Sequence, residues 1–191
     1  VLDRSMRVLQ KVAGDETYGY IDGFIAASDD SVFHVCRNRE ALHRSSHDGT
    51  VEAEYQLEDY EFWSPVLAPA SLLFCVIYVD GDDERDEIVA LDAQTLQLRH
   101  RFGLGLLNEA QQMAVGGDEL YVCDTGNHRL QVFSLTGEHR RSIVGAWRAP
   151  ERLCFAKDRL YLVGARHDDP LHGNRVLVLS LQGDILQVVT H

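Results

Sequence analysis

The sequence predicts an all-β fold in which one small unit of four strands is repeated. Three observations predict it. Apolar residues alternate with polar ones over short segments, Gly or Asp turns interrupt these segments about every 8–12 residues, and the whole pattern recurs along the chain. The last strand of each unit is expected to start near residues 7, 51, 97, 139 and 185. A period of about 40–45 residues with four short strands is typical of the blades of a β-propeller.

The clearest unit spans residues 120–145, where a short apolar strand, a polar turn and a second alternating strand are followed by a Thr136-Gly137 turn. A second copy begins at Leu160 and turns through Gln182-Gly183. Weaker copies, with turns at Asp48-Gly49 and at Ala93-Gln94-Thr95, occupy residues 33–57 and 73–102. Because Gly and Asp tolerate the backbone geometry of tight turns, these positions are expected to separate the strands of each unit.

The first residues of the chain repeat its last ones, since Val1–Gly14 aligns without gaps to Val178–His191. The predicted organisation is therefore the outer strands of a partial blade followed by four blades, at residues 1–14, 15–58, 59–103, 104–145 and 146–191. The innermost strands of the four blades are expected at residues 24–27, 66–68, 112–115 and 152–155. Pro65 and Pro150 lie at or just before two of them, where a strand does not yet need a ladder donor.

The segment LYVCDTGNHRLQVFSLTG, residues 120–137, closely resembles the NHL repeat, including the Asn127-His128-Leu130 region. The likeness is fair in the fourth unit and weak in the first two. This resemblance implies an NHL-like propeller, of which this chain would form an incomplete ring, because such domains commonly have six blades. It also implies a surface that docks peptides, proteins or RNA. Some relatives of the family are enzymes, notably an amidating lyase with a metal site in the central channel.

The residues that carry the resemblance are expected to be structural. Asp124, Asn127 and Arg129 lie around the turn between the second and third strands, and Asn174 and Arg175 correspond to them in the last unit. Asp or Asn at such a turn can bond its own backbone two residues on, and the arginine can bridge to the facing strand. His128 is expected to point toward one rim, where it is a candidate for partner binding.

An incomplete ring leaves two open blade faces, and exposed apolar area costs about 25 cal/mol per Å². Either further blades or another chain is therefore expected to cover these faces, so self-association through open blade ends is an alternative to missing blades.

Composition narrows the classes of partner. The net charge is −12, which disfavours nucleic acid, and His139-Arg140-Arg141 is too short to form a phosphate-binding stripe. The longest apolar run, Leu72–Val79, is too short to span a membrane and suits a strand buried on both faces. Four cysteines, Cys36, Cys75, Cys123 and Cys154, show no metal-binding spacing. Small buried thiols in a reducing compartment are the expected explanation, which predicts a cytoplasmic location.

No cofactor or metal is predicted. The acidic stretch from Asp80 to Glu87 fails the EF-hand pattern, because Arg85 stands where Gly is required, and a solvated hairpin tip is expected there. Weak metal candidates are His167, Asp168 and His172, in a segment whose Pro170 and Gly173 are typical of a loop. Phosphate-binding, dinucleotide-binding and nucleophile-elbow motifs do not occur in the sequence. The chain is therefore expected not to be an enzyme, and the alternative is a metal-dependent lyase or hydrolase that uses the channel.

Two tryptophans, Trp63 and Trp147, each precede a proline where the chain leads into an innermost strand. Packing between blades is one interpretation. If the rings are exposed, they are expected to anchor a partner together with Tyr60, Phe62 and Arg148, because aromatic residues and arginine are enriched at interface hot spots. The sequence thus predicts a non-catalytic scaffold that docks a protein or peptide on its loop face.

Overall fold

The computed structural model describes residues 21–36, 41–58, 60–79, 82–164 and 175–190. Within these ranges the chain forms sixteen β-strands and no helix, so none of the described segments is a helix able to cross a membrane. The strands form four antiparallel sheets, each with four strands in the order of the sequence. We number the sheets as blades 1 to 4.

Each blade runs from its innermost to its outermost strand. Blade 1 contains β1 (Ile21–Ala27), β2 (Val32–Cys36), β3 (Ala41–Ser45) and β4 (Val51–Gln56). Blade 2 contains β5 (Tyr60–Ala68), β6 (Leu72–Val79), β7 (Asp82–Asp92) and β8 (Leu98–Phe102). Blade 3 contains β9 (Ala110–Gly116), β10 (Glu119–Asp124), β11 (Arg129–Ser134) and β12 (His139–Ile143). Blade 4 contains β13 (Pro150–Ala156), β14 (Arg159–Gly164), β15 (Arg175–Leu179) and β16 (Ile185–Thr190).

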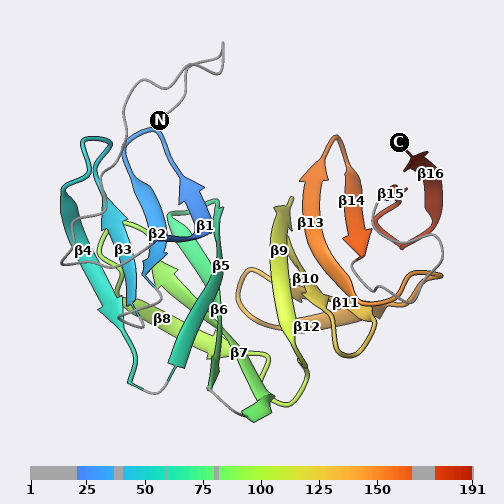
Figure 1. Ribbon diagram of the computed structural model, residues 1–191, viewed down its shortest axis with the longest axis horizontal. Helices are drawn as coiled ribbons and strands as arrows, with labels where there is room; N and C mark the ends of the chain where they lie inside the picture. The colour runs from blue at the N-terminus through green and yellow to red at the C-terminus, as the bar shows by residue number, and fades with distance from the viewer. Residues whose placement is uncertain (1–20, 37–40, 59, 80–81, 165–174, 191) are drawn as a thin grey trace.

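The four sheets fan out from a common axis. The first strand of each blade contacts the first strand of the next, so that β1 touches β5, β5 touches β9 and β9 touches β13. In Figure 1 these four strands lie side by side in the middle of the molecule, with β4 and β16 at its outer edges. This is the arrangement of β-propeller blades, and it confirms the predicted all-β fold and the partial propeller. The innermost strands include the segments predicted for them, and β4, β8, β12 and β16 start within one residue of the expected positions.

The long apolar run of β6 explains how neighbouring blades are held together. Leu73, Cys75 and Ile77 pack against Phe33, Val35 and Leu42 of blade 1. Phe74 and Val76 point the other way and pack against blade 3. All five of these β6 side chains are fully buried, because successive residues of a strand point to opposite faces of its sheet. A strand between two blades must therefore be apolar on both faces, as predicted for residues 72–79.

The turns before the outermost strands of blades 1, 3 and 4 have the same backbone geometry. Gly49, Gly137 and Gly183 have φ angles of 93°, 87° and 96°, and each donates its N–H to the carbonyl oxygen of a serine three residues earlier. Side chains other than glycine rarely adopt such angles. Blade 2 lacks the glycine and turns through Ala93–Gln97, where Leu96 takes the positive φ of 55°.

Two expectations meet a different outcome, and a third is not tested. Cys75 and Cys123 are buried thiols, and burial raises the pKa of both, but Cys154 is exposed. It lies on the face of blade 4 that points away from blade 3, where the described chain has no further blade. Asp86 is not solvated either, since only 2% of it is exposed. The partial blade predicted for residues 1–14 lies outside the described residues.

Candidate functional site

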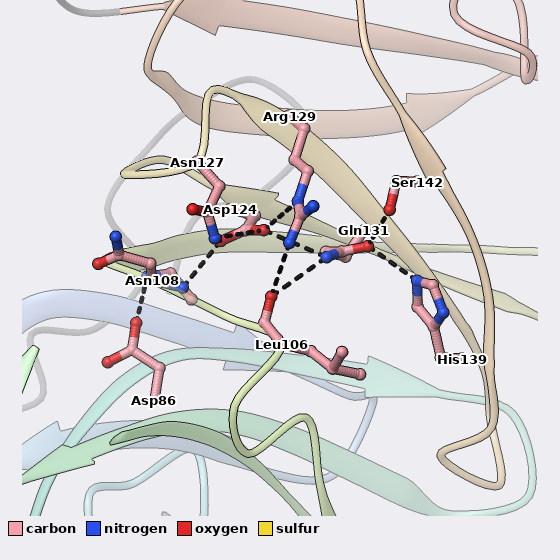
Figure 2. A network of polar contacts seen from close by, with 10 residues as sticks. Asp86, Leu106, Asn108, Asp124, Asn127, Arg129, Gln131, His139 and Ser142 are labelled. Atoms are coloured by element: carbon pink, nitrogen blue, oxygen red, sulfur yellow. Dashed lines mark hydrogen bonds and ion pairs between the residues drawn. The ribbon is translucent and has the colours of Figure 1, made fainter. Parts of the chain in front are cut away.

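The carboxylate of Asp124 is the centre of a polar network in blade 3 (Figure 2). Asp124 ends β10 and is fully buried. Its Oδ1 accepts hydrogen bonds from the backbone N–H of Asn108 at 2.8 Å and from Asn127 Nδ2 at 3.0 Å. Its Oδ2 accepts from Arg129 Nε at 2.6 Å and from Gln131 Nε2 at 3.2 Å. The donors come from the loop before β9, the turn after β10 and strand β11, so one carboxylate joins three segments.

The network continues outward from Arg129 and Gln131. Both donate to the carbonyl oxygen of Leu106, at 3.0 and 3.1 Å, which fixes the loop that leads into blade 3. Gln131 Oε1 also lies 2.8 Å from His139 Nε2 and 2.7 Å from Ser142 Oγ, both on β12 (Figure 2). The arginine thus bridges to the facing strand, as the sequence predicted. The expectation for Asp124 is a bond to the backbone two residues further along its own turn. Its carboxylate instead accepts the backbone N–H of Asn108, in the loop before β9.

His128 bonds the next blade. Its Nδ1 accepts the backbone N–H of Ala149 at 3.2 Å, just before β13. In blade 2 the corresponding residue is Asp86, whose Oδ2 accepts the N–H of Ala110 at 2.5 Å at the start of β9. Each residue stands two positions before the first fully buried apolar residue of its third strand, Leu130 or Ile88. The same position therefore holds the start of the following blade in two successive repeats.

A second inter-blade bond also recurs. Ser64 Oγ in β5 accepts the N–H of Met113 in β9 at 3.2 Å, and Gln112 Oε1 in β9 accepts the N–H of Leu153 in β13 at 2.9 Å. In addition, Thr125 Oγ1 donates to the carbonyl oxygen of Pro150 at 2.6 Å. Sequence reasoning missed Ser64, Asp86 and Gln112, because their partners lie 24 to 49 residues away and no local pattern marks them.

The sequence pattern of the NHL repeat matches residues 107–133, which include this network from Asn108 to Gln131. Blade 3 thus contains an NHL repeat. The matched segment is the one that contains these hydrogen bonds, so the polar residues of this repeat join a loop, a turn and a strand here. Asn174, predicted to repeat Asn127, lies outside the described residues, and Arg175 begins β15.

Solved structures similar to this chain show the same fold. Hydrazine synthase from Kuenenia stuttgartiensis aligns with a TM-score of 0.68 and 15% identity over 91% of this chain and 53% of its own. A chain of a nidogen–laminin complex aligns with a TM-score of 0.63 and 16% identity over 85% and 60%. A protein of unknown function from Bacteroides caccae aligns at 0.64 and 11% over 87% and 59%. The chain therefore spans about half to three-fifths of the length of these structures. No curated protein matches its sequence.

The aromatic residues proposed as anchors divide into two groups. Phe62 and Trp147 are 3% and 6% exposed and belong to the cores between blades. Trp147 thus follows the packing interpretation, and neither ring is exposed as a partner-binding role would require. Trp63 is half-buried, lies against Tyr78 with ring centres 5.5 Å apart and ring planes tilted by 30°, and donates a hydrogen bond to Glu61. Tyr60 lies under the guanidinium of Arg101, 5.5 Å away. Arg148 is exposed, in the loop next to the NHL repeat.

The loops beside the NHL repeat form one rim of the propeller. We call residues 103–109, 125–128 and 144–149 the crossover rim, because it contains the connections between blades. Its parts are joined by hydrogen bonds from Gly126 N to Asn108 O at 3.0 Å and from Ala149 N to His128 Nδ1 at 3.2 Å. Three large apolar side chains of this rim are exposed, at 60% for Leu104, 39% for Leu106 and 75% for Val144.

Metal ligands do not gather in the described part of the chain, where no group of three or more His, Cys, Asp or Glu side chains could hold an ion. The candidates His167, Asp168 and His172 lie outside the described residues. These three residues therefore stay weak, untested candidates, and the expectation that the chain binds no metal is likewise untested.

A buried histidine pair lies on the face of blade 1 that points away from blade 2. His34 Nε2 is 3.0 Å from Ser45 Oγ, and His43 Nε2 is 2.7 Å from Glu54 Oε2. The two imidazole rings meet edge to face at 5.2 Å. Burial, and secondly the charge of His43, lower the pKa of His34 from 6.5 to about 4.

This pKa predicts a loss of stability in acid. As the pH falls below 6.5, the unfolded chain binds a proton at His34 before the folded chain does, so folding becomes less favourable until about pH 4. We expect the free energy of unfolding to fall by about 2–3 kcal/mol between pH 7 and pH 4 through this group. His34→Gln should remove that part of the slope in urea unfolding measured across the range. Equal slopes for both proteins would contradict the assignment.

Proposed function

We propose that this chain is a non-catalytic, NHL-type propeller scaffold that binds a protein or peptide on its crossover rim. The supporting observation is the exposure of Leu104, Leu106 and Val144 in two loops of that rim. Exposed apolar side chains that gather on one face commonly mark interaction surfaces. Arg148, which is exposed in the same loop as Val144, adds a residue type that is enriched at interfaces.

The network below the rim supports the same proposal. The carbonyl oxygen of Leu106 is held by Arg129 and Gln131, and Ala149 by His128, so both loops are anchored before any partner arrives. A surface that is already ordered loses less conformational entropy on binding. The polar residues of the NHL repeat would then act as positioning residues, and the apolar tips of the loops as the contact surface. We propose a cytoplasmic setting for this scaffold, where its cysteines would stay reduced.

Peptides selected from a displayed random library against the purified chain provide the test. We expect the affinity of the selected peptides to fall at least about ten-fold when Leu104 and Val144 are both changed to Asp, because apolar contact would be replaced by buried charge. The matched control is Leu98→Asp, at a residue that is 43% exposed on β8 outside this rim. Binding that is unchanged by the double substitution, or lost equally with Leu98→Asp, would contradict the proposal.

A further inference from the structure

A cleft of about 500 Å³ opens between blades 1 and 2, away from the crossover rim. It lies where the hairpin turns at residues 28–31, 69–71 and 93–97 meet, which we call the hairpin rim. This volume is within the range of about 300–1,000 Å³ that is typical of ligand pockets. Its apolar part is formed by Phe33, Leu67, Ala68 and Ala93, and the rest of its lining by polar residues, of which Ser28, Asp30, Ser71 and Gln94 are exposed.

The walls of the cleft are held in place by local hydrogen bonds. Asp92 Oδ1 accepts from the N–H groups of Gln94 and Thr95 at 3.0 and 2.9 Å, and Asp92 Oδ2 pairs with Arg99. Ala93 N donates to Ser71 O at 2.7 Å, which ties the two turns of blade 2 together. On the other wall, the N–H of Ser31 donates to Ser28 Oγ at 3.1 Å. The cleft therefore exists without a ligand to shape it.

Asp30 and Arg44 are the charged residues that line the cleft, and Glu52 beside it pairs with Arg44, so one carboxylate is in excess. Arg44 is neutralised by Glu52, with Nη1 and Oε2 3.1 Å apart, and its Nη1 also donates to Ser31 Oγ at 3.3 Å. Asp30 is exposed and makes no ion pair within the described part of the chain. Asp29, beside it, adds a further negative charge to the same turn. The protein as a whole carries a net charge of −12. A cation is therefore attracted to this margin, and an anion is repelled.

We infer that the cleft between blades 1 and 2 binds a lysine or arginine side chain of a partner polypeptide. Such side chains combine an apolar stem with a charged head, and they commonly lay the stem along apolar surface while the head stays near water. Here the stem would contact Phe33, Leu67 and Ala93, and the head would reach the carboxylate of Asp30. The inference concerns the opposite rim from the proposed docking surface, so the two can fail independently.

Short peptides of defined charge provide the test. We expect Gly-Gly-Lys-Gly-Gly and its arginine analogue to shift the NMR signals of residues around the cleft, with an affinity that falls as salt is added. Peptides with glutamate or norleucine in place of the lysine should bind more weakly or not at all. Asp30→Asn should weaken lysine-peptide binding about three- to ten-fold, because it removes the charged partner and keeps the shape of the side chain.

The neighbouring carboxylate is the matched control. Asp29→Asn removes the same charge from the same turn but from a residue that does not line the cleft, and it should change the affinity less than about two-fold. Ala68→Phe, which fills the cleft, should abolish binding while the hairpin turns stay folded, as judged by the remaining NMR signals. Equal effects of the Asp29 and Asp30 variants, equal binding of the glutamate peptide, or no binding of basic peptides at millimolar concentration would each overturn the inference.

Discussion

Replacing Asp124 with alanine should lower the free energy of unfolding by about 3–5 kcal/mol, the cost of removing one partner from a buried ion pair. The substitution takes away the acceptor of the Asn108 N–H and of the Asn127 and Arg129 side chains. The half-buried N–H of Asn108 and the partly buried Arg129 guanidinium would lose a partner, and an unsatisfied buried donor costs about 1–3 kcal/mol. The side chain of Asn127 is exposed, so it can turn to water. Urea unfolding followed by circular dichroism measures the change.

The control for this prediction is Asp118→Ala, one residue before β10. Asp118 also pairs with an arginine, Arg140, at 2.8 Å, but its side chain is 81% exposed. Surface ion pairs contribute little, so this variant should unfold close to the wild type. The free energy of unfolding of Asp124→Asn should lie between those of the two alanine variants. Its amide oxygen can still accept hydrogen bonds, but its amide nitrogen would lie against N–H donors that now bond the second carboxylate oxygen. Similar unfolding midpoints for Asp124→Ala and Asp118→Ala would show that the network does not hold the blade together.

The sequence could predict the fold because the signals of a propeller blade are local. The alternation within β11, the Thr136-Gly137 turn and the apolar run of β6 each depend on residues close in the chain. Repetition of these signals then placed the strands of weaker units such as blade 1. The bonds between blades could not be predicted in this way. In the sequence, Asp86 is one acid among several in a polar stretch, and its bond to Ala110 comes from a segment of the next blade that no local pattern marks.

The sequence alone also could not predict which strand faces are buried by a neighbouring blade. Cys154 and Ala114 occupy the same position of successive innermost strands. Ala114 is covered by blade 4, whereas the face of blade 4 that carries Cys154 meets no further blade within the described residues. Likewise, the exposed tips Leu104 and Val144 look like ordinary apolar residues in the sequence. Their role as candidates for docking follows only from the crossover rim that brings their loops together.

Replacing Trp147 with alanine should cost about 3 kcal/mol or more of stability, as is usual for a large buried ring. The indole packs in the core between blades 3 and 4 and lies against the turn at Gly183, where it is 6% exposed. It also fits tightly, because a Cβ built on Gly145 would lie 1.9 Å from its ring. This variant is therefore expected to destabilise the chain before it can report on partner binding.

Trp147→Phe separates packing from hydrogen bonding at this position. The indole Nε1 is buried and makes no hydrogen bond within the described part of the chain, so losing its N–H removes a desolvated donor along with part of the ring. The two effects oppose each other. We therefore expect the free energy of unfolding to fall by less than about 1.5 kcal/mol, which is a smaller loss than in the alanine variant. Arg148→Ala, at the exposed neighbour, should stay within about 0.5 kcal/mol of the wild type. Losses below about 1 kcal/mol for both the alanine and the phenylalanine variants would mean that the ring does not fill this core, and Trp147 would again be a candidate for surface contact.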